Sequence, residues 1–352
     1  MTRTDQREIR LGLPSKGRLE GETLAFLDGC GLRVDRTNPR QYVARIPALP
    51  QVTVWFQRAS VIPFQVRDGD IDLAITGYDR VAEAGVDGDV IVLYDRLGYG
   101  NCELVLAVPE AWQAVETVED LAAEARRRAQ EGRPLRVATK YTRLVGEFLE
   151  AHQVMPYRLI AVEGALEAAP GMGYADIIAD LTATGTTLRD NHLKRLEGGA
   201  ILYSEACLIG NRQALSQRPE VLGVARQLLE YIEAHLRARS YHAIIANIRG
   251  ESPEAVAARV FSQPDLGGLQ GPTISRVYVR DGSPGWYAIS IVVRKDRLHA
   301  AVEQLRAIGG SGVVVTPATY IFEEEPAAYR RLLEQLKGLP TTDQGRYREV
   351  RH

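Results

Sequence analysis

Short apolar runs alternate with helix-like segments along most of the chain. Runs such as Ile9–Leu13, Val52–Phe56 and Leu135–Thr139 have the length and β-branched content of buried strands. Between them, segments such as Glu20–Cys30 repeat apolar residues at helical spacing. This alternation predicts an α/β fold, in which the strands share sheets that the helices cover.

The pattern changes after the amphipathic helix that we expect at Pro219–Arg239. The following segments read as a strand, a helix, two strands, a helix and a strand, at Tyr241–Ile248, Ser252–Val260, Thr273–Val279, Trp286–Val293, Leu298–Ile308 and Val313–Thr316. That βαββαβ order is the ferredoxin-like arrangement, so the sequence predicts a separate C-terminal domain. The residues after Glu325 form a charged tail to which the sequence assigns no role.

The stretch Glu167–Leu188 holds the most specific candidate chemistry. Its strand-like part, Ala175–Ala179, leads through Asp180 into a loop of small and hydroxylated residues: Thr182, Ala183, Thr184, Gly185, Thr186 and Thr187. Glycine lets the backbone approach a ligand closely, and N–H groups with threonine hydroxyls can converge on an oxyanion. An ordinary strand-to-helix turn with a threonine N-cap is the alternative interpretation.

Two carboxylates favour a ligand site over an ordinary turn. Asp176 and Asp180 stand four positions apart in a strand, so both side chains are expected on the same face. Carboxylates beside a phosphate-type loop suggest contacts with ribose hydroxyls or a metal ion.

Basic residues follow several predicted strands. Lys16 and Arg18 lie in the turn after the first strand, at the edge where open α/β sheets bind ligands. A solvated basic turn explains Lys16 and Arg18 equally well. Arg58 could likewise be either a ligand-binding residue or a surface charge. Lys140 opens another strand-to-helix turn, whereas Arg126–Arg128 is expected to be solvated helix surface.

Composition narrows the classes of function. The chain has 352 residues with 45% hydrophobic and 25% charged residues, and its net charge is -2. That charge favours neither nucleic acid nor an anionic membrane, so phosphate binding would need a local site. The three cysteines lack zinc-site spacing, and no signal-peptide or membrane-spanning pattern is evident, which predicts a cytoplasmic protein.

The stretch resembles the signature of the ATP phosphoribosyltransferase family, which opens histidine biosynthesis. That signature runs from a glutamate, through a glycine six positions later and an aspartate, to a Thr-Gly-x-Thr-Leu ending. Its fixed positions are all matched, by Glu167, Gly173, Ala175, Ile178, Asp180, Leu181, Thr184, Gly185, Thr187 and Leu188.

The resemblance implies a reaction and roles for the candidate residues. Phosphoribosyl pyrophosphate would donate its ribosyl carbon to N1 of the ATP adenine with Mg²⁺ as cofactor. The 5-phosphate would bind Ala183–Thr187 beside Thr182, and the ribose hydroxyls would bind Asp176 and Asp180. Lys16, Arg18 and Arg58 would make the catalytic contacts with the polyphosphate groups of the substrates. Glu163, at another strand end, joins the substrate-binding set.

The same resemblance implies a two-lobed, periplasmic-binding-protein-like catalytic part. Lobe I would comprise residues 1–100 and 191–240, lobe II residues 101–190, the ferredoxin-like domain 241–325 and the tail 326–352. The glycine-bearing segment Arg96–Gly100 is the expected hinge. In this family the added domain binds histidine as a feedback inhibitor, and the enzyme assembles as a homo-hexamer built from dimers.

Two other functions fit a two-lobed cleft. One is a non-catalytic ligand-binding protein, since the same architecture serves binding as well as catalysis. The other is a regulatory homologue without activity, although the intact loop together with Lys16 and Arg18 argues against it.

Overall fold

The computed structural model describes residues 8–338 except Pro39, Asp87, Glu163, Ala165 and Asp281. The chain divides into two compact units, one of Met1–Leu229 with Ala327–His352 and the other of Glu230–Pro326. Two sheets form the first unit and a third sheet forms the second. No helix in the part described combines the length and apolar character that crossing a bilayer requires.

The first sheet has six strands in the order β2-β3-β1-β4-β11-β5. Its strands are β1 (Ile9–Pro14), β2 (Val43–Arg45), β3 (Val52–Gln57), β4 (Leu73–Gly77), β5 (Val90–Tyr94) and β11 (Ala206–Asn211). The helices in the same part of the chain are α1 (Arg18–Gly29), α2 (Ile62–Arg67), α3 (Tyr78–Ala84) and α7 (Arg212–Gln217). Strands β3, β1 and β4 run parallel, so the turns that follow them share one sheet edge.

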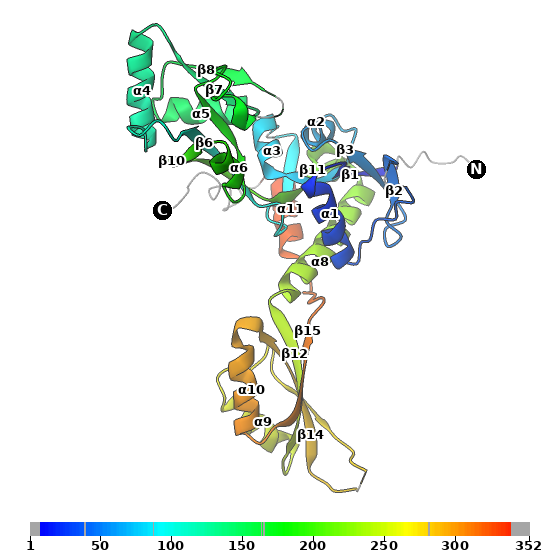
Figure 1. Cartoon of the computed structure of the whole chain (residues 1–352). Helices are drawn as coiled ribbons and strands as arrows, with labels where there is room; N and C mark the ends of the chain where they lie inside the picture. The colour runs from blue at the N-terminus through cyan, green and yellow to red at the C-terminus, as the bar shows by residue number, and fades with distance from the viewer. Residues whose placement is uncertain are drawn as a thin grey trace, which may run out of the picture. The chain divides into compact units, whose positions relative to one another are not determined.

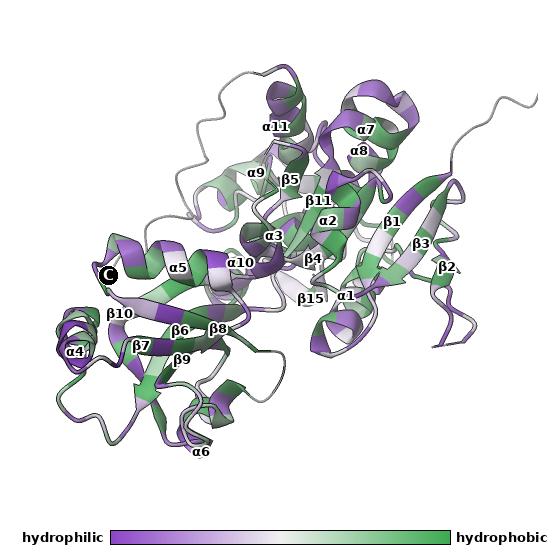
Figure 2. Cartoon of the chain, turned by 90° about the horizontal axis from the view of Figure 1, so that it is seen from above, coloured by the Kyte–Doolittle hydropathy of each residue, from purple (hydrophilic) through white to green (hydrophobic). Residues whose placement is uncertain are grey.

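The second sheet has five strands in the order β10-β6-β9-β7-β8. Its strands are β6 (Cys102–Pro109), β7 (Leu135–Thr139), β8 (Tyr157–Ala161), β9 (Ile177–Thr182) and β10 (Leu193–Ser204). Its helices are α4 (Val118–Gln130), α5 (Thr142–Ala151) and α6 (Thr186–Asp190), with a 3₁₀ turn η1 (Leu166–Ala168). Strands β7, β8 and β9 are parallel, whereas β6 runs antiparallel to β9. Figure 2 shows hydrophobic and hydrophilic residues alternating along α5, as expected of a helix that covers a sheet.

The chain crosses between the two sheets twice, and the crossings are hydrogen-bonded to each other. Leu97 N donates to Ala206 O at 3.0 Å, and Ala206 N donates to Tyr99 O at 3.0 Å. The predicted hinge Arg96–Gly100 forms the first crossing. The second crossing falls at Glu205, later than the predicted return at residue 191, because β10 pairs with β6 and so belongs to the second sheet.

The unit Glu230–Pro326 contains the predicted βαββαβ domain. Its elements are β12 (Tyr241–Arg249), α9 (Pro253–Phe261), β13 (Thr273–Arg276), β14 (Trp286–Arg294), α10 (Leu298–Ala307) and β15 (Ser311–Pro317), with a 3₁₀ turn η2 (Lys295–Arg297) before α10. The helices contribute Val256, Val260, Ala301 and Leu305 to a core shared with β12 and β14. The predicted fold class, two α/β lobes followed by a ferredoxin-like domain, is confirmed.

Helix α8 (Pro219–Ala238) begins in the first unit, and its last turns belong to the second. In the second unit, Tyr231 makes edge contacts with the rings of Tyr320 and Phe322. The second unit thus begins at Glu230, before the predicted boundary at Tyr241, and these aromatic contacts lie within it.

The tail contains helix α11 (Ala327–Leu336), which returns to the first unit. It packs on β5 and α7 and buries Ala328 and Leu332. Arg212 Nη1 of α7 donates to Gln335 O at 3.2 Å. Figure 1 shows α11, near the red end of the colour scale, beside elements of the first sheet. The segment 327–338 is therefore part of the fold of the first unit, and the predicted tail beyond it lies outside the described residues.

We expect Leu332→Ala to destabilise the first unit by about 2 to 5 kcal/mol, because truncating a buried leucine removes apolar burial and leaves a cavity. Glu334→Ala, at an exposed position of the same helix, is the control and should leave stability nearly unchanged. Chemical denaturation of the full-length variants measures both effects. Equal stabilities for the two variants would show that α11 does not contribute to the unit.

Candidate active site

The loop after β9 has the open backbone that its sequence predicts. Gly185 adopts φ 73° and ψ 2°, a left-handed conformation that glycine adopts without strain. Gly185 N donates to Thr182 Oγ1 at 2.9 Å, which turns the chain back on itself. The side chains of Ala183, Thr184, Thr186 and Thr187 are exposed, so the loop presents its hydroxyls to solvent.

Arg189 lies against this loop from the last turn of α6. Its Nη2 donates to Thr186 Oγ1 at 3.3 Å, and its Nη1 donates to Thr184 O at 3.5 Å. The loop therefore combines hydroxyl groups with a nearby positive charge, as an oxyanion site requires.

Asp180 lies in β9, two residues before the loop begins. Burial raises the pKa of its carboxyl above the usual range. The Leu181 N–H, which donates to Asp180 Oδ1 at 2.9 Å, and the positive charges of Lys140 and Arg80 oppose part of this rise. The nearby Glu167 carboxylate adds to the rise. The charges of both basic and acidic side chains thus act on Asp180, toward the carboxyl end of its strand.

Lys16 and Arg58 lie at one edge of the first sheet. They follow β1 and β3, whose last residues Pro14 and Gln57 are paired in register. Ser15 N donates to Gln57 O at 2.8 Å, which continues this pairing into the turns. Both basic side chains are exposed at the edge where parallel α/β sheets bind ligands.

Arg18 links the first sheet to the second. Its Nη2 donates to Asn101 O at 3.3 Å, immediately before β6. In the second sheet, Glu103 of β6 is paired with Thr182 of β9. Arg18 is therefore placed near the strand end from which the hydroxylated loop leaves.

Asp176 has a different environment from Asp180. Its Oδ1 accepts hydrogen bonds from Arg128 Nη2 at 2.5 Å and Arg136 Nη2 at 3.0 Å. Its Oδ2 accepts from Arg136 N at 2.8 Å, and only 8% of its side-chain surface is exposed. Asp176 immediately precedes β9, and four residues of extended chain separate it from Asp180 by about 13 Å. Asp176 lies at the amino end of β9, so the structure does not bring it to the loop.

Arg128 also differs from its expected role as solvated surface. Only 13% of its side chain is exposed, and its guanidinium lies 5.4 Å from the centroid of the Trp112 ring. It helps to fix α4 against the strand that carries Asp176.

A buried polar network joins the two sheets. Asp79, in the first turn of α3, is 4% exposed. Its Oδ2 accepts a hydrogen bond from Tyr141 Oη at 2.7 Å, and its Oδ1 accepts from Ser204 Oγ at 3.0 Å. Tyr141 precedes α5 in the second sheet's layer, so the network fixes the two lobes to each other.

A second contact supports this network. The Glu83 carboxylate at the end of α3 accepts hydrogen bonds from the backbone N–H groups of Arg143 and Leu144, at 2.9 and 3.1 Å. These N–H groups lie in the first turn of α5 and have no partner within that helix. A carboxylate from one lobe thus caps a helix of the other.

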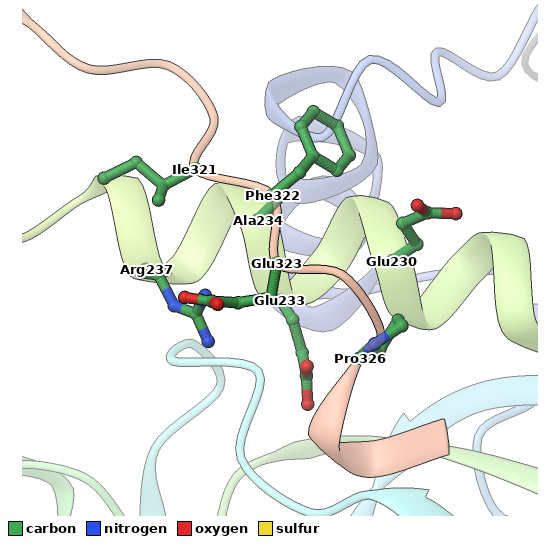
Figure 3. Close-up of a pocket in the computed structure, with 8 residues that line it drawn as sticks. All are labelled: Glu230, Glu233, Ala234, Arg237, Ile321, Phe322, Glu323 and Pro326. Atoms are coloured by element: carbon green, nitrogen blue, oxygen red, sulfur yellow. The ribbon is translucent and has the colours of Figure 1, made fainter. Parts of the chain in front are cut away.

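A small hollow in the second unit is separate from these residues. Helix α8 and the segment that leads to α11 line it, with Glu230, Arg237 and Glu323 among the lining residues. Figure 3 shows the Arg237 guanidinium beside the Glu323 carboxylate, with which it forms an ion pair. None of the predicted site residues lines this hollow. Glu163, which was also predicted to bind substrate, lies outside the described residues.

Family comparisons match both parts of the chain. Residues 58–234 match the family described as ATP phosphoribosyltransferase, and residues 238–320 match the HisG C-terminal domain. ATP phosphoribosyltransferase 2, chloroplastic, from Arabidopsis thaliana is 47% identical over 335 residues, which cover 94% of this chain and 81% of the relative.

The chain belongs to the ATP phosphoribosyltransferase family.

Other members of the ATP phosphoribosyltransferase family are more distant. The ATP phosphoribosyltransferase of Nitrobacter winogradskyi is 34% identical, with 92% of this chain and 96% of the relative covered. A solved ATP phosphoribosyl transferase (HisG:HisZ) complex from Thermotoga maritima matches at 23% identity and a TM-score of 0.49, covering 64% of this chain and 98% of that chain. Membership makes the chain a pentosyltransferase of histidine biosynthesis.

The sequence signature of this family did not point to Arg80, Tyr141 or Arg189. Tyr141 follows Lys140 and Arg189 lies just beyond the signature, but a lone arginine or tyrosine carries no sequence pattern of its own, and the same holds for Arg80. Their positions depend on contacts between segments that are distant in sequence, such as the Tyr141–Asp79 hydrogen bond.

We expect Asp176→Asn to destabilise the protein by about 3 kcal/mol at pH 7, because it removes the buried anion that pairs with the partly buried Arg128 and Arg136. Burial raises the pKa of Asp176, but the hydrogen bonds and charges of Arg136 and Arg128 outweigh burial and hold the pKa below its usual range. The folded state thus favours the ionised carboxylate above the unfolded pKa of about 3.9. The stability difference between wild type and variant should shrink as pH falls below that value.

Denaturant titrations between pH 7 and pH 3 measure this effect, with Asp68→Asn as the control because Asp68 is an exposed ion-pair partner of Arg67. The folded Asp176→Asn protein should keep its Michaelis constant for phosphoribosyl pyrophosphate. A large increase in that constant, with stability unchanged, would instead place Asp176 in the substrate site.

Proposed function

We propose that the hydroxylated loop, Asp180 and the basic turns of the first sheet form the site that transfers the ribosyl group of phosphoribosyl pyrophosphate to N1 of the ATP adenine. The observation that carries this proposal is the contact of Arg18 with Asn101, which brings a cation of one lobe toward the loop of the other. Family membership supplies the reaction, and the geometry supports the assignment of residues to it.

The loop Thr182–Thr187 suits the 5-phosphate. Gly185 keeps the backbone open, and the exposed hydroxyls of Thr184, Thr186 and Thr187 can donate to phosphate oxygens. Arg189 already touches this loop and adds positive charge. We assign the ribose hydroxyls to Asp180 alone, because Asp176 is held by two arginines at the other end of the strand.

The leaving group determines where the cations act. Adenine N1 carries an available lone pair, so no side chain has to remove a proton before it attacks the ribosyl carbon. Departing pyrophosphate gains negative charge while the sugar becomes oxocarbenium-like, and fixed cations stabilise that charge. Lys16, Arg18 and Arg58 are exposed at the sheet edge and take this role in the proposal.

The donor set also fits Mg²⁺, which is part of the proposal. Mg²⁺ is usually held by one or two carboxylates together with substrate phosphates, rather than by a cage of protein ligands. We assign this role to Asp180 and Glu167, whose negative charge raises the pKa of Asp180, and no group of three or more His, Cys, Asp or Glu side chains in the described ranges is arranged to hold a metal. When bound, the ion neutralises charge on the pyrophosphate.

Regulation and assembly extend the same proposal. The second unit matches the HisG C-terminal domain, which supports a role in feedback inhibition by histidine. A homo-hexamer built from dimers and a cytoplasmic location are carried over from the family resemblance and the sequence composition. Incubation with ATP, phosphoribosyl pyrophosphate and Mg²⁺ tests the central activity, since phosphoribosyl-ATP forms only if the protein is catalytic.

Asp180→Asn should lower kcat/KM for phosphoribosyl pyrophosphate by about tenfold to a hundredfold, the effect of losing one charge-assisted contact. Asp190→Asn is the matched control, because Asp190 is exposed at the end of the neighbouring helix α6. Steady-state kinetics with each substrate varied in turn separates the two sites. Wild-type kinetics in Asp180→Asn would remove Asp180 from the site.

Replacing the second unit by a short Gly-Ser linker between Leu229 and Ala327 should preserve transfer and abolish inhibition by histidine. The design keeps α11, which belongs to the first unit, and it is feasible because Glu230 and Pro326 line the same small hollow. Activity is measured with and without histidine, beside the full-length chain. Unchanged inhibition of the shortened protein would assign histidine binding to the first unit.

A further inference from the structure

We propose that Arg80 is a further substrate-contacting residue, whose guanidinium donates hydrogen bonds to the diphosphate of phosphoribosyl pyrophosphate. In this proposal Asp79, Tyr141 and Ser204 are positioning residues that hold the guanidinium in place. The inference rests on the proposed function and adds to the site a cation that neither the signature nor the strand-end pattern identifies.

The position of Arg80 is fixed by two contacts. Its Nε forms an ion pair with Asp79 Oδ2 at 3.0 Å, and its guanidinium lies 4.7 Å from the centroid of the Tyr141 ring. Both contacts use the inner part or the face of the guanidinium. Its side chain remains 26% exposed, and its Nη groups have no hydrogen-bond partner among the described residues.

Asp79 is itself held rigidly. Its carboxylate accepts hydrogen bonds from Tyr141 Oη and Ser204 Oγ, and its own N–H donates to Ser204 Oγ at 2.9 Å. A buried carboxylate with these neutral donors still requires a counter-charge, which Arg80 provides. The network therefore orients an arginine of the first lobe without occupying all of its donors.

The surroundings of Tyr141 show where Arg80 points. Tyr141 follows the carboxyl end of β7, whose residue Thr139 is paired with Ala179, the neighbour of Asp180. Arg80 is close enough to both Asp180 and Cys102 for its charge to oppose the rise that burial causes in their pKa values. The charge of Arg18 opposes the rise at Cys102 as well. Arg18 and Arg80 thus approach the start of β6 from the first lobe.

The diphosphate is the anion that fits this arrangement. The 5-phosphate already has the hydroxylated loop and Arg189 as partners, whereas the region near Arg18 and Arg80 holds cations from the opposite lobe. A diphosphate carries several negative charges, and a guanidinium can donate two parallel hydrogen bonds to phosphate oxygens. Arg80 would therefore stabilise the group whose charge increases as the glycosidic bond breaks.

Two probes separate this role from a purely structural ion pair. Inorganic pyrophosphate with Mg²⁺ represents the diphosphate, and ribose 5-phosphate represents the part of the substrate that the loop holds. Calorimetry measures the dissociation constant of each probe for wild type, Arg80→Ala, Arg80→Lys and Tyr141→Phe. Arg67→Ala is the control, because Arg67 is an exposed arginine of the same lobe paired with its neighbour Asp68. Thermal denaturation verifies that each variant is folded.

Arg80→Ala should weaken pyrophosphate binding about tenfold to a hundredfold and leave ribose 5-phosphate binding unchanged. Arg80→Lys should fall between wild type and Arg80→Ala, because lysine keeps the charge but loses the planar fork. Tyr141→Phe removes the hydroxyl and keeps the ring, so it should weaken pyrophosphate binding less than Arg80→Ala does.

Unchanged pyrophosphate binding in folded Arg80→Ala or Arg80→Lys would overturn the proposal and leave Arg80 as the counter-ion of Asp79. Selective loss of ribose 5-phosphate binding would also overturn it, because Arg80 would then serve the loop. These outcomes are distinct from failure of the proposed function, which would appear as absence of phosphoribosyl-ATP formation by the wild-type protein.

Discussion

The relative arrangement of the two catalytic lobes depends on the buried carboxylate of Asp79. It lies in one lobe and accepts a hydrogen bond from Tyr141 of the other, while Ser204 reaches it from the end of β10. Removing charge from water is unfavourable unless hydrogen bonds and a counter-ion compensate for it, so this site has a narrow set of satisfactory arrangements. That constraint, with the Glu83 cap on α5, gives the two sheets a defined relation.

A fixed relation between the lobes matters because the proposed site is divided between them. One lobe supplies an open, hydroxylated loop and the Asp180 carboxylate, and the other supplies cations at the ends of parallel strands. Neither half alone offers both a sugar-phosphate site and the positive charge that the leaving pyrophosphate requires. Alignment of two substrates across the lobes therefore depends on contacts such as the hydrogen bond from Arg18 to Asn101.

Local sequence patterns predicted the fold class and the exposed loop, whereas the remaining features depend on contacts between segments that are distant in sequence. Strand periodicity and the signature around Gly185 were sufficient for the α/β class and for the exposed loop. Strand periodicity also placed Asp176 and Asp180 on one face, but it ignores the length of strand between them and the arginines that α4 and β7 bring to Asp176. The packing of α11 on the first unit depends on the burial of Leu332. The charged sequence of the tail gives no sign of this tertiary contact.

The most direct test of the account is a structure of the full-length protein with phosphoribosyl pyrophosphate and Mg²⁺ bound. The account predicts the 5-phosphate within hydrogen-bond distance of the backbone and hydroxyls of Thr184–Thr187, with the ribose hydroxyls at Asp180. A sugar phosphate bound elsewhere, with this loop contacting only solvent, would contradict it.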